Sequence, residues 1–283
     1  MRKSIYNRLL VLILLLTIAG CTGTQFGYRF LDSLMRWRLN EYVSLQGEQS
    51  REVDAALDAF HTWHQRDQLP LYKNFLAKQT TVLEREAINA AQLQQAYESG
   101  IVFWKDSMER LLPDAARMLS QLDQAQLIQL QKNMDAKNAE YEEERISPPL
   151  AKRQQERQKR MRETLEKWIG DLTETQEQRL KEWVTDLNYE TGARLQQRRL
   201  LRERFEQLLP LRKQPERLQQ ALAQLMVHPE RQWTPAYRKY VYFNRQQTYR
   251  LLIDLHRSLT EKQKKRLLDK LEGYQQDFAN LSA

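Results

Sequence analysis

Two histidines, His61 and His64, are the side chains in this sequence best placed for metal chemistry. A spacing of three residues brings both imidazoles to one face of a helix, which is a spacing that zinc ligands use. Asp58 and Asp67 are the nearest acids, however, and no cysteine stands close by. His64 also continues an apolar helical stripe with Phe60, which favours histidines packed in the core or at a helix end over a metal site.

Sequence motifs of common enzyme classes are absent from the chain. It has no Gly-rich phosphate loop, no G-x-S-x-G and no H-E-x-x-H. The acidic run at 142–144 is typical of a solvated surface near a helix end rather than of a catalytic acid pair. We therefore expect no catalytic residues, no metal ligands and no cofactor, and we do not expect an enzyme.

Cys21 is the only cysteine among the 283 residues, which excludes an internal disulfide framework. It follows a basic segment and an apolar run at 9–19 that only Thr17 interrupts. Eleven residues are too few to span a bilayer comfortably, and this order of segments is typical of a secretory signal peptide. The basic residues before the run are Arg2, Lys3 and Arg8.

Ile18, Ala19 and Gly20 directly precede Cys21, and this stretch resembles the bacterial lipobox. The resemblance implies cleavage before Cys21 and transfer of a diacylglycerol to its thiol. Thr22 rather than an aspartate follows, which under the enterobacterial sorting rule implies an outer-membrane destination. Because two or more acyl chains anchor a protein stably, we expect a lipoprotein held at the inner leaflet of the outer membrane and facing the periplasm.

Composition predicts an all-α protein. Gly and Pro number only eight each, the charged fraction is 29%, and no segment alternates with the period of two that marks strands. The formal net charge is +8, and three of these charges lie in the signal segment, which leaves +5. A mildly basic, exported chain is not expected to bind nucleic acid. Its charge suits anionic lipid head groups or acidic proteins, and a generic solubilising role explains it equally well.

Helical periodicity is clearest in three apolar stripes, within 48–66, around 180–187 and in the last helix. Pro70 is expected to mark a turn that opens another helix, and Gly100 and Pro113 to mark later breaks. Further helices are expected over 123–145 and 151–169. The stripes consist of Val53, Leu57, Phe60 and His64; Leu180, Trp183, Val184 and Leu187; and Leu267, Leu271, Tyr274, Phe278 and Leu281.

The clearest internal boundary is Ser147-Pro148-Pro149, because neither proline sits inside a helix without cost. We expect an elongated all-α bundle of about seven to nine helices behind the lipoprotein signal. Its expected parts are the signal peptide (1–20), an anchored tether with a first helical segment (21–47), helical region one (48–147) and helical region two (148–283). The two helical regions could also form one continuous domain.

The segment 28–42 mixes aromatic and basic residues close to the expected anchor. Amphipathic rings and arginines are favoured at membrane interfaces, which gives one interpretation of this segment. A first helix packed on the body is the other, and we favour it. The residues are Tyr28, Phe30, Trp37 and Tyr42 with Arg29, Arg36 and Arg38.

One short pattern recurs four times, at 45–49 (LQGEQ), 122–126 (LDQAQ), 172–176 (LTETQ) and 259–263 (LTEKQ). A Thr or Asp in second position can cap a helix, and the Gln three residues later can reach back to the N–H of the cap. Gln46 is a poor helix cap, so the first copy is a degenerate version of the motif. If four copies mean two duplicated halves, a boundary near Gly170 is natural. The expected cap residues are Leu122, Asp123, Gln126, Leu172, Thr173, Gln176, Leu259, Thr260 and Gln263.

The two threonine-containing copies resemble the LTxxQ motif of the Spy and CpxP family of periplasmic stress proteins. That resemblance covers about twenty residues, and it implies a helical cradle that holds unfolding clients or restrains a sensor kinase. This chain is about twice as long as those proteins and is expected to be lipid-anchored. More of the chain resembles an uncharacterised proteobacterial lipoprotein family without an assigned activity. The residues that carry this second resemblance are Tyr28, Arg29, Leu31 and Asp32, then His61, Trp63, His64, Leu69, Pro70 and Tyr72.

Aromatic and basic residues alternate again over 233–250. Trp233, Tyr237 and Tyr240 share a helix face, which favours core packing, and the alternative is a groove with Arg238 and Lys239 that grips an extended chain. We expect a membrane-anchored binding protein, chaperone-like or related to envelope stress, whose partners are unfolded clients or another protein. The alternative is a structural or assembly lipoprotein that docks one dedicated envelope partner. The sequence does not indicate an oligomeric state.

Overall fold

The computed structural model describes residues 25–85 and 87–283. The signal segment and Cys21 lie outside these residues. Over the described part, the chain forms eleven α-helices and no β-strand, so the all-α prediction is confirmed. The number of helices exceeds the seven to nine expected. In chain order the helices are α3 (Leu31–Asn40), α4 (Gly47–Trp63), α5 (Leu69–Leu83), α6 (Ala90–Gln121), α7 (Gln124–Arg145), α8 (Leu150–Ile169), α9 (Glu174–Asp186), α10 (Gly192–Leu208), α11 (Pro215–Met226), α12 (Pro235–Arg257) and α13 (Glu261–Ser282).

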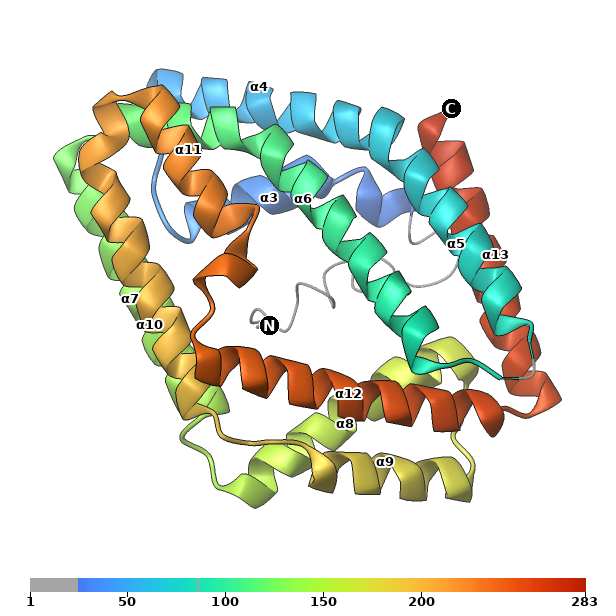
Figure 1. Cartoon of the computed structure of the whole chain (residues 1–283). Coiled ribbons are helices and arrows are strands. Elements are labelled where there is room, and N and C mark those ends of the chain that lie inside the picture. The colour runs from blue at the N-terminus through green and yellow to red at the C-terminus, as the bar shows by residue number, and fades with distance from the viewer. Residues whose placement is uncertain (1–24, 86) are drawn as a thin grey trace.

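The helices follow the sides of a four-sided frame rather than one common axis (Figure 1). α4 forms the top side, and α5 turns down from its end to form a second side, along which α13 packs. α7 and α10 form a third side, and α8, α9 and α12 a fourth. The long helix α6 crosses the frame, and α11 packs against it. Within the described residues, none of these helices is long and apolar enough to cross a membrane.

The helix α6 runs through both predicted break points, so the breaks expected at Gly100 and Pro113 are wrong. A glycine in a helix interior costs about 1 kcal/mol and a proline about 3 kcal/mol. The helix nevertheless continues because it is buried on two sides. Phe103 packs in a cluster with α5 and α13, and Leu112 and Leu119 pack in another with α7 and α11. Each of these burials contributes about 1.5–3 kcal/mol, so together they exceed the local cost.

The turn expected at Pro70 is a π-helical segment, η1 (His64–Gln68), and the chain stays helical from Gly47 to Leu83. The N–H of Leu69 donates to the carbonyl of His64, five residues earlier. A widened turn of this kind accommodates the missing N–H and the ring of Pro70, which would clash in a regular α-helix. The proline therefore redirects the backbone hydrogen bonds and does not end the helix.

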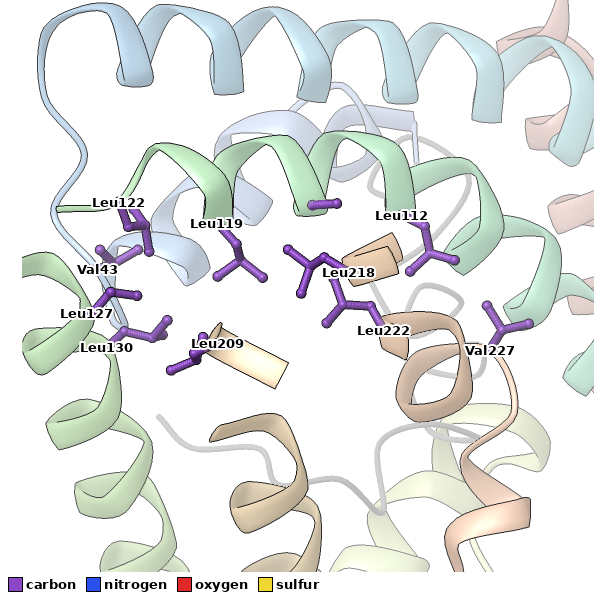
Figure 2. Close-up of a cluster of buried hydrophobic side chains, with 11 residues drawn as sticks. Val43, Leu112, Leu119, Leu122, Leu127, Leu130, Leu209, Leu218, Leu222 and Val227 are labelled. Atoms are coloured by element: carbon purple, nitrogen blue, oxygen red, sulfur yellow. The ribbon is translucent and has the colours of Figure 1, made fainter. Parts of the chain in front are cut away.

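Three clusters of buried apolar side chains hold the frame together. The first joins α6, α7 and α11 around Leu218 and Leu222 (Figure 2). The second packs α5 and α6 against α13, and the third packs α8 and α9 against α12. The first two clusters combine residues from before and after residue 148, so the two helical regions share their cores. The second and third predicted stripes are buried in these clusters, apart from the partly buried Leu267. The first predicted stripe is also buried, outside the three clusters.

Candidate functional site

The glutamines that end the third and fourth copies of the recurring motif bind each other. Nε2 of Gln176 donates to Oε1 of Gln263 at 2.9 Å, and Nε2 of Gln263 donates back to Oε1 of Gln176 at 2.8 Å. Both side chains are buried, with 1% and 5% of their surface exposed. This pair ties the start of α9 to the start of α13, which are 87 residues apart in sequence.

Each of these two side chains makes every hydrogen bond that a primary amide offers. The second hydrogen of Gln176 goes to the carbonyl of Ser258 at 3.0 Å, and that of Gln263 goes to the carbonyl of Asp171 at 2.8 Å. The oxygens accept in addition the cap N–H groups of Thr173 and Thr260, both at 3.0 Å. The two amides are thus buried at little cost, because no polar atom of theirs lacks a partner.

The first and second copies form a pair with the same pattern of bonds. Nε2 of Gln49 donates to Oε1 of Gln126 at 3.0 Å, and the reverse bond measures 2.7 Å. The remaining amide hydrogens go to the carbonyls of Gln121 and Ser44, at 2.8 and 3.0 Å. In all four copies the accepting carbonyl lies two residues before the cap of the partner motif. We refer to the pair Gln49–Gln126 as the first clasp and to Gln176–Gln263 as the second clasp.

The cap residues of the motif take part in the clasps through their backbone and side chains. Asp123, Thr173 and Thr260 are the N-caps of α7, α9 and α13, and each side chain accepts the N–H of the glutamine three residues on. Leu122 is buried in the first apolar cluster, and Leu172 packs against the third. Leu259 is partly buried. The sequence predicted these local capping bonds but not the pairing of the glutamines. The recurrence of a glutamine at the same position of all four copies was the feature that could have indicated it.

His64 lies at the start of the π-helical segment, between two tyrosine hydroxyls. Its Nδ1 is 2.8 Å from the hydroxyl of Tyr28, and its Nε2 is 3.1 Å from that of Tyr72. Burial and the neighbouring His61 lower the pKa of His64 to about 4, so the ring is neutral at pH 7. A neutral imidazole offers one donor and one acceptor, which fits two hydroxyl partners. Burial also raises the pKa of Tyr72 to about 12.

The two histidines face different surroundings. His61 faces Asp32, with Nδ1 and Oδ1 3.8 Å apart, while His64 is enclosed by aromatic rings. No group of three His, Cys, Asp or Glu side chains that could hold a metal ion occurs in the part of the chain that the structure describes. The arrangement joins the segment around Tyr28 to α4 and α5 and offers no reactive group.

The aromatic residues at the start of α12 separate into two groups. Trp233 meets Tyr237 edge to face, Tyr237 stacks on Tyr240, and Tyr240 is buried, so this trio packs largely on itself. Tyr242 and Phe243, one turn further on, are 58% and 41% exposed.

Arg238 and Lys239, which the sequence indicated as part of a possible binding groove, are exposed on the same helix as Tyr242 and Phe243. Residues four apart on a helix are neighbours, so Arg238 adjoins Tyr242 and Lys239 adjoins Phe243. We refer to these four residues as the α12 face. It combines two exposed rings with two positive charges, which suits contact with another macromolecule more than chemistry on a small substrate.

A family model described as "Family of unknown function (DUF6279)" matches residues 41–238, which is more than half of the chain. The chain belongs to this family. Among the curated proteins and among the solved structures, no match to the chain was found. The expectation of an uncharacterised family is confirmed to this extent.

The DUF6279 region contains the whole first clasp and the α9 side of the second. Gln263 and the helix α13 lie beyond the matched residues. The second clasp therefore links the DUF6279 region to the C-terminal helix, and the second apolar cluster packs that same helix against α5.

Proposed function

We propose that this DUF6279 protein is a lipid-anchored binding protein of the bacterial envelope that holds unfolded protein clients without chemistry of its own. Its anchor would be a lipid on Cys21, and its body would face the periplasm from the inner leaflet of the outer membrane. The α12 face is the observation that carries the binding part of this proposal. The lipobox-like sequence before Cys21 supports the proposed localisation.

The α12 face has the properties that a client-holding surface needs. Exposed aromatic rings take up apolar segments of a chain that has lost its fold, and adjacent positive charges attract its acidic side chains. Arg245 adds a cation near this surface, because its guanidinium lies 4.4 Å from the ring of Tyr97 on α6 and 5.7 Å from that of Tyr242. The attraction between the guanidinium and the two rings holds this cation in place beside Tyr242.

The clasps support the resemblance to the LTxxQ proteins in a physical sense. A cradle must keep its helices in place while a client binds and leaves, and the four motifs fix the starts of α4, α7, α9 and α13. Because the bonds of the clasps are internal, they leave the α12 face free for a client.

The test is suppression of aggregation by the purified mature protein. At stoichiometric ratios we expect the protein to reduce light scattering from several unfolded clients. Replacing both Tyr242→Ser and Phe243→Ser is expected to remove at least half of that effect. The matched control is Ile128→Ser with Leu150→Ser, because both side chains are large, apolar and 55% and 47% exposed on other helices.

Two outcomes separate this function from its alternative. If the unaltered protein does not slow aggregation of any client, the chaperone-like function is wrong. If crosslinking in intact envelopes instead captures one partner at a fixed ratio, and the α12 variant loses it, the protein is a docking lipoprotein for that partner.

A further inference from the structure

The segment 26–37, which ends in α3 and lies nearest to the expected anchor, carries a stripe of exposed apolar side chains. Phe26 is 66% exposed, Phe30 47%, Leu34 51% and Trp37 58%. The remaining large exposed apolar side chains of the described residues are spread over five other helices. Single exposed apolar residues are ordinary on a protein surface, whereas a cluster of four on one segment marks a contact surface.

Leu34 and Trp37 are three residues apart on α3 and therefore face the same side of it. Phe30 is the N-cap residue of α3, and its carbonyl accepts the N–H of Leu34, while Phe26 lies in the helical turn before it. The rings of Phe26 and Phe30 touch edge to face, with centroids 5.0 Å apart, so the stripe is continuous at its N-terminal end. On the opposite side, Tyr28 is buried and Leu31 and Leu39 pack against the core. The body of the protein thus holds the helix by one side and leaves the stripe to solvent.

Two arginines flank the stripe. Arg29 and Arg38 are exposed, and Arg38 pairs with Glu41 at the end of α3. Asp32 points to the protein, where its carboxylate faces His61. An apolar stripe with aromatic rings and flanking arginines is a pattern found in segments that lie in the interface of a bilayer.

Chain length restricts what can cover this stripe. Only five residue steps separate Cys21 from Phe26, and an extended chain spans at most ~3.6 Å per residue, or roughly 18 Å in all. If Cys21 carries a lipid, the stripe cannot leave the neighbourhood of the membrane surface.

We propose that the stripe Phe26, Phe30, Leu34 and Trp37 inserts into the lipid head-group interface and so fixes the orientation of the helical frame on the membrane. This inference rests on the proposed lipid anchor and goes beyond it. An anchor alone would let the frame rotate freely, whereas an anchor and an adjacent stripe together determine which side of the frame faces the periplasm. Both interpretations of residues 28–42 then apply. One side of this segment packs on the body of the protein, and the other side contacts the membrane interface.

The experiment places an environment-sensitive fluorophore on each of two equally exposed positions. Leu34→Cys and, as a matched control, Ile128→Cys on α7 (55% exposed) are labelled with a nitrobenzoxadiazole probe. The labelled native lipoprotein is reconstituted into vesicles of phosphatidylethanolamine and phosphatidylglycerol. At position 34 we expect a blue shift, a severalfold rise in emission and quenching by doxyl-labelled lipid. At position 128 we expect none of these. Phe30→Ser with Trp37→Ser is expected to reverse the effect at position 34.

The possible failures are distinguishable. Mass spectrometry of the N-terminal peptide reports acylation separately, and an unmodified Cys21 overturns the anchor and this inference together. If Cys21 is acylated and positions 34 and 128 respond alike, only this inference is wrong. A blue shift at position 34 that needs no lipid and grows with protein concentration means that a second copy covers the stripe, which also overturns the inference.

Discussion

The two clasps use the same hydrogen bonds in different surroundings. In the second clasp both glutamines are buried and both caps are threonines. In the first clasp Gln49 is partly exposed, and its oxygen lies 3.4 Å from the N–H of Gln46, compared with 3.0 Å for the corresponding bonds of the second clasp. The motif therefore determines which atoms pair, and the packing around it determines how far water is excluded from the pair.

A glycine accompanies the looser geometry of the first clasp. Gly47, the residue after the cap, has φ of +53°, a conformation that other residues rarely adopt. The other three copies have Gln124, Glu174 and Glu261 at this position. The first copy, expected to be degenerate because of Gln46, nevertheless contributes its glutamine to the pair as the other copies do. A weak cap thus affects the local turn and leaves the long-range bonds in place.

The largest expected effect is that of Gln176→Ala in the second clasp. It removes a partner from Gln263, from the N–H of Thr173 and from the carbonyl of Ser258, all in a buried place. A buried polar group without a partner costs about 1–3 kcal/mol, so we expect a loss of about 4 kcal/mol in the free energy of unfolding. Urea unfolding followed by circular dichroism measures this loss. Gln178→Ala, at an exposed glutamine on the same helix, is the control and should change stability by less than about 0.5 kcal/mol. Equal effects of the two variants would contradict the role of the clasp.

The next largest expected effect is a dependence of stability on pH. It cannot come from the clasps, because glutamine amides do not titrate. α4 begins at the first clasp, and the residue after its end is His64, whose pKa is lowered to about 4 by burial and by His61. The unfolded chain binds a proton at this residue near its ordinary pKa of about 6.5. Stability from His64 is therefore complete above about pH 6.5 and is lost as the pH falls toward 4, by up to about 3 kcal/mol. Unfolding midpoints measured from pH 7 to 4 should fall more steeply for the unaltered protein than for His64→Gln, and parallel curves would show that this histidine is not the cause.

The smallest effect is expected from Gln49→Ala in the first clasp. Water can reach this partly exposed side chain and replace some of its bonds, so we expect a loss of about 2 kcal/mol, half of that for Gln176→Ala. The comparison is made under identical conditions by urea unfolding. A loss as large as in the second clasp would mean that burial does not set the difference between the two.

Local rules predicted much of the fold. The apolar stripe from Leu271 to Leu281, the caps Thr173 and Thr260, and the long helices follow from periodicity and capping, which depend on residues within one or two turns of each other. The breaks at Gly100 and Pro113 were wrong because the local cost of these residues is opposed by packing against helices that are distant in sequence. The helix expected to open at Pro70 is α5, but a widened helical turn rather than a break precedes it, because a helix can absorb a proline by widening one turn.

The exposed residues of α12 were predicted only in part. Arg238 and Lys239 are exposed, but the exposed rings beside them belong to Tyr242 and Phe243 and not to the trio from Trp233 to Tyr240. All these aromatic residues lie in one stretch of sequence, and periodicity alone does not say which side of α12 the rest of the protein covers. The helices packed against α12 decide this, and they come from α6, α9 and α10.

The sequence by itself determined that this protein is made of helices, where most of them begin, and that four glutamines occupy equivalent positions at four helix starts. Only the tertiary structure decided that these glutamines bind in pairs, that α6 runs unbroken, and that one side of the first helix is left exposed. The physical reason is the range of the interactions: capping and periodicity act within a few residues, whereas the clasps and the buried clusters join residues that are tens of positions or more apart and meet only in the folded chain.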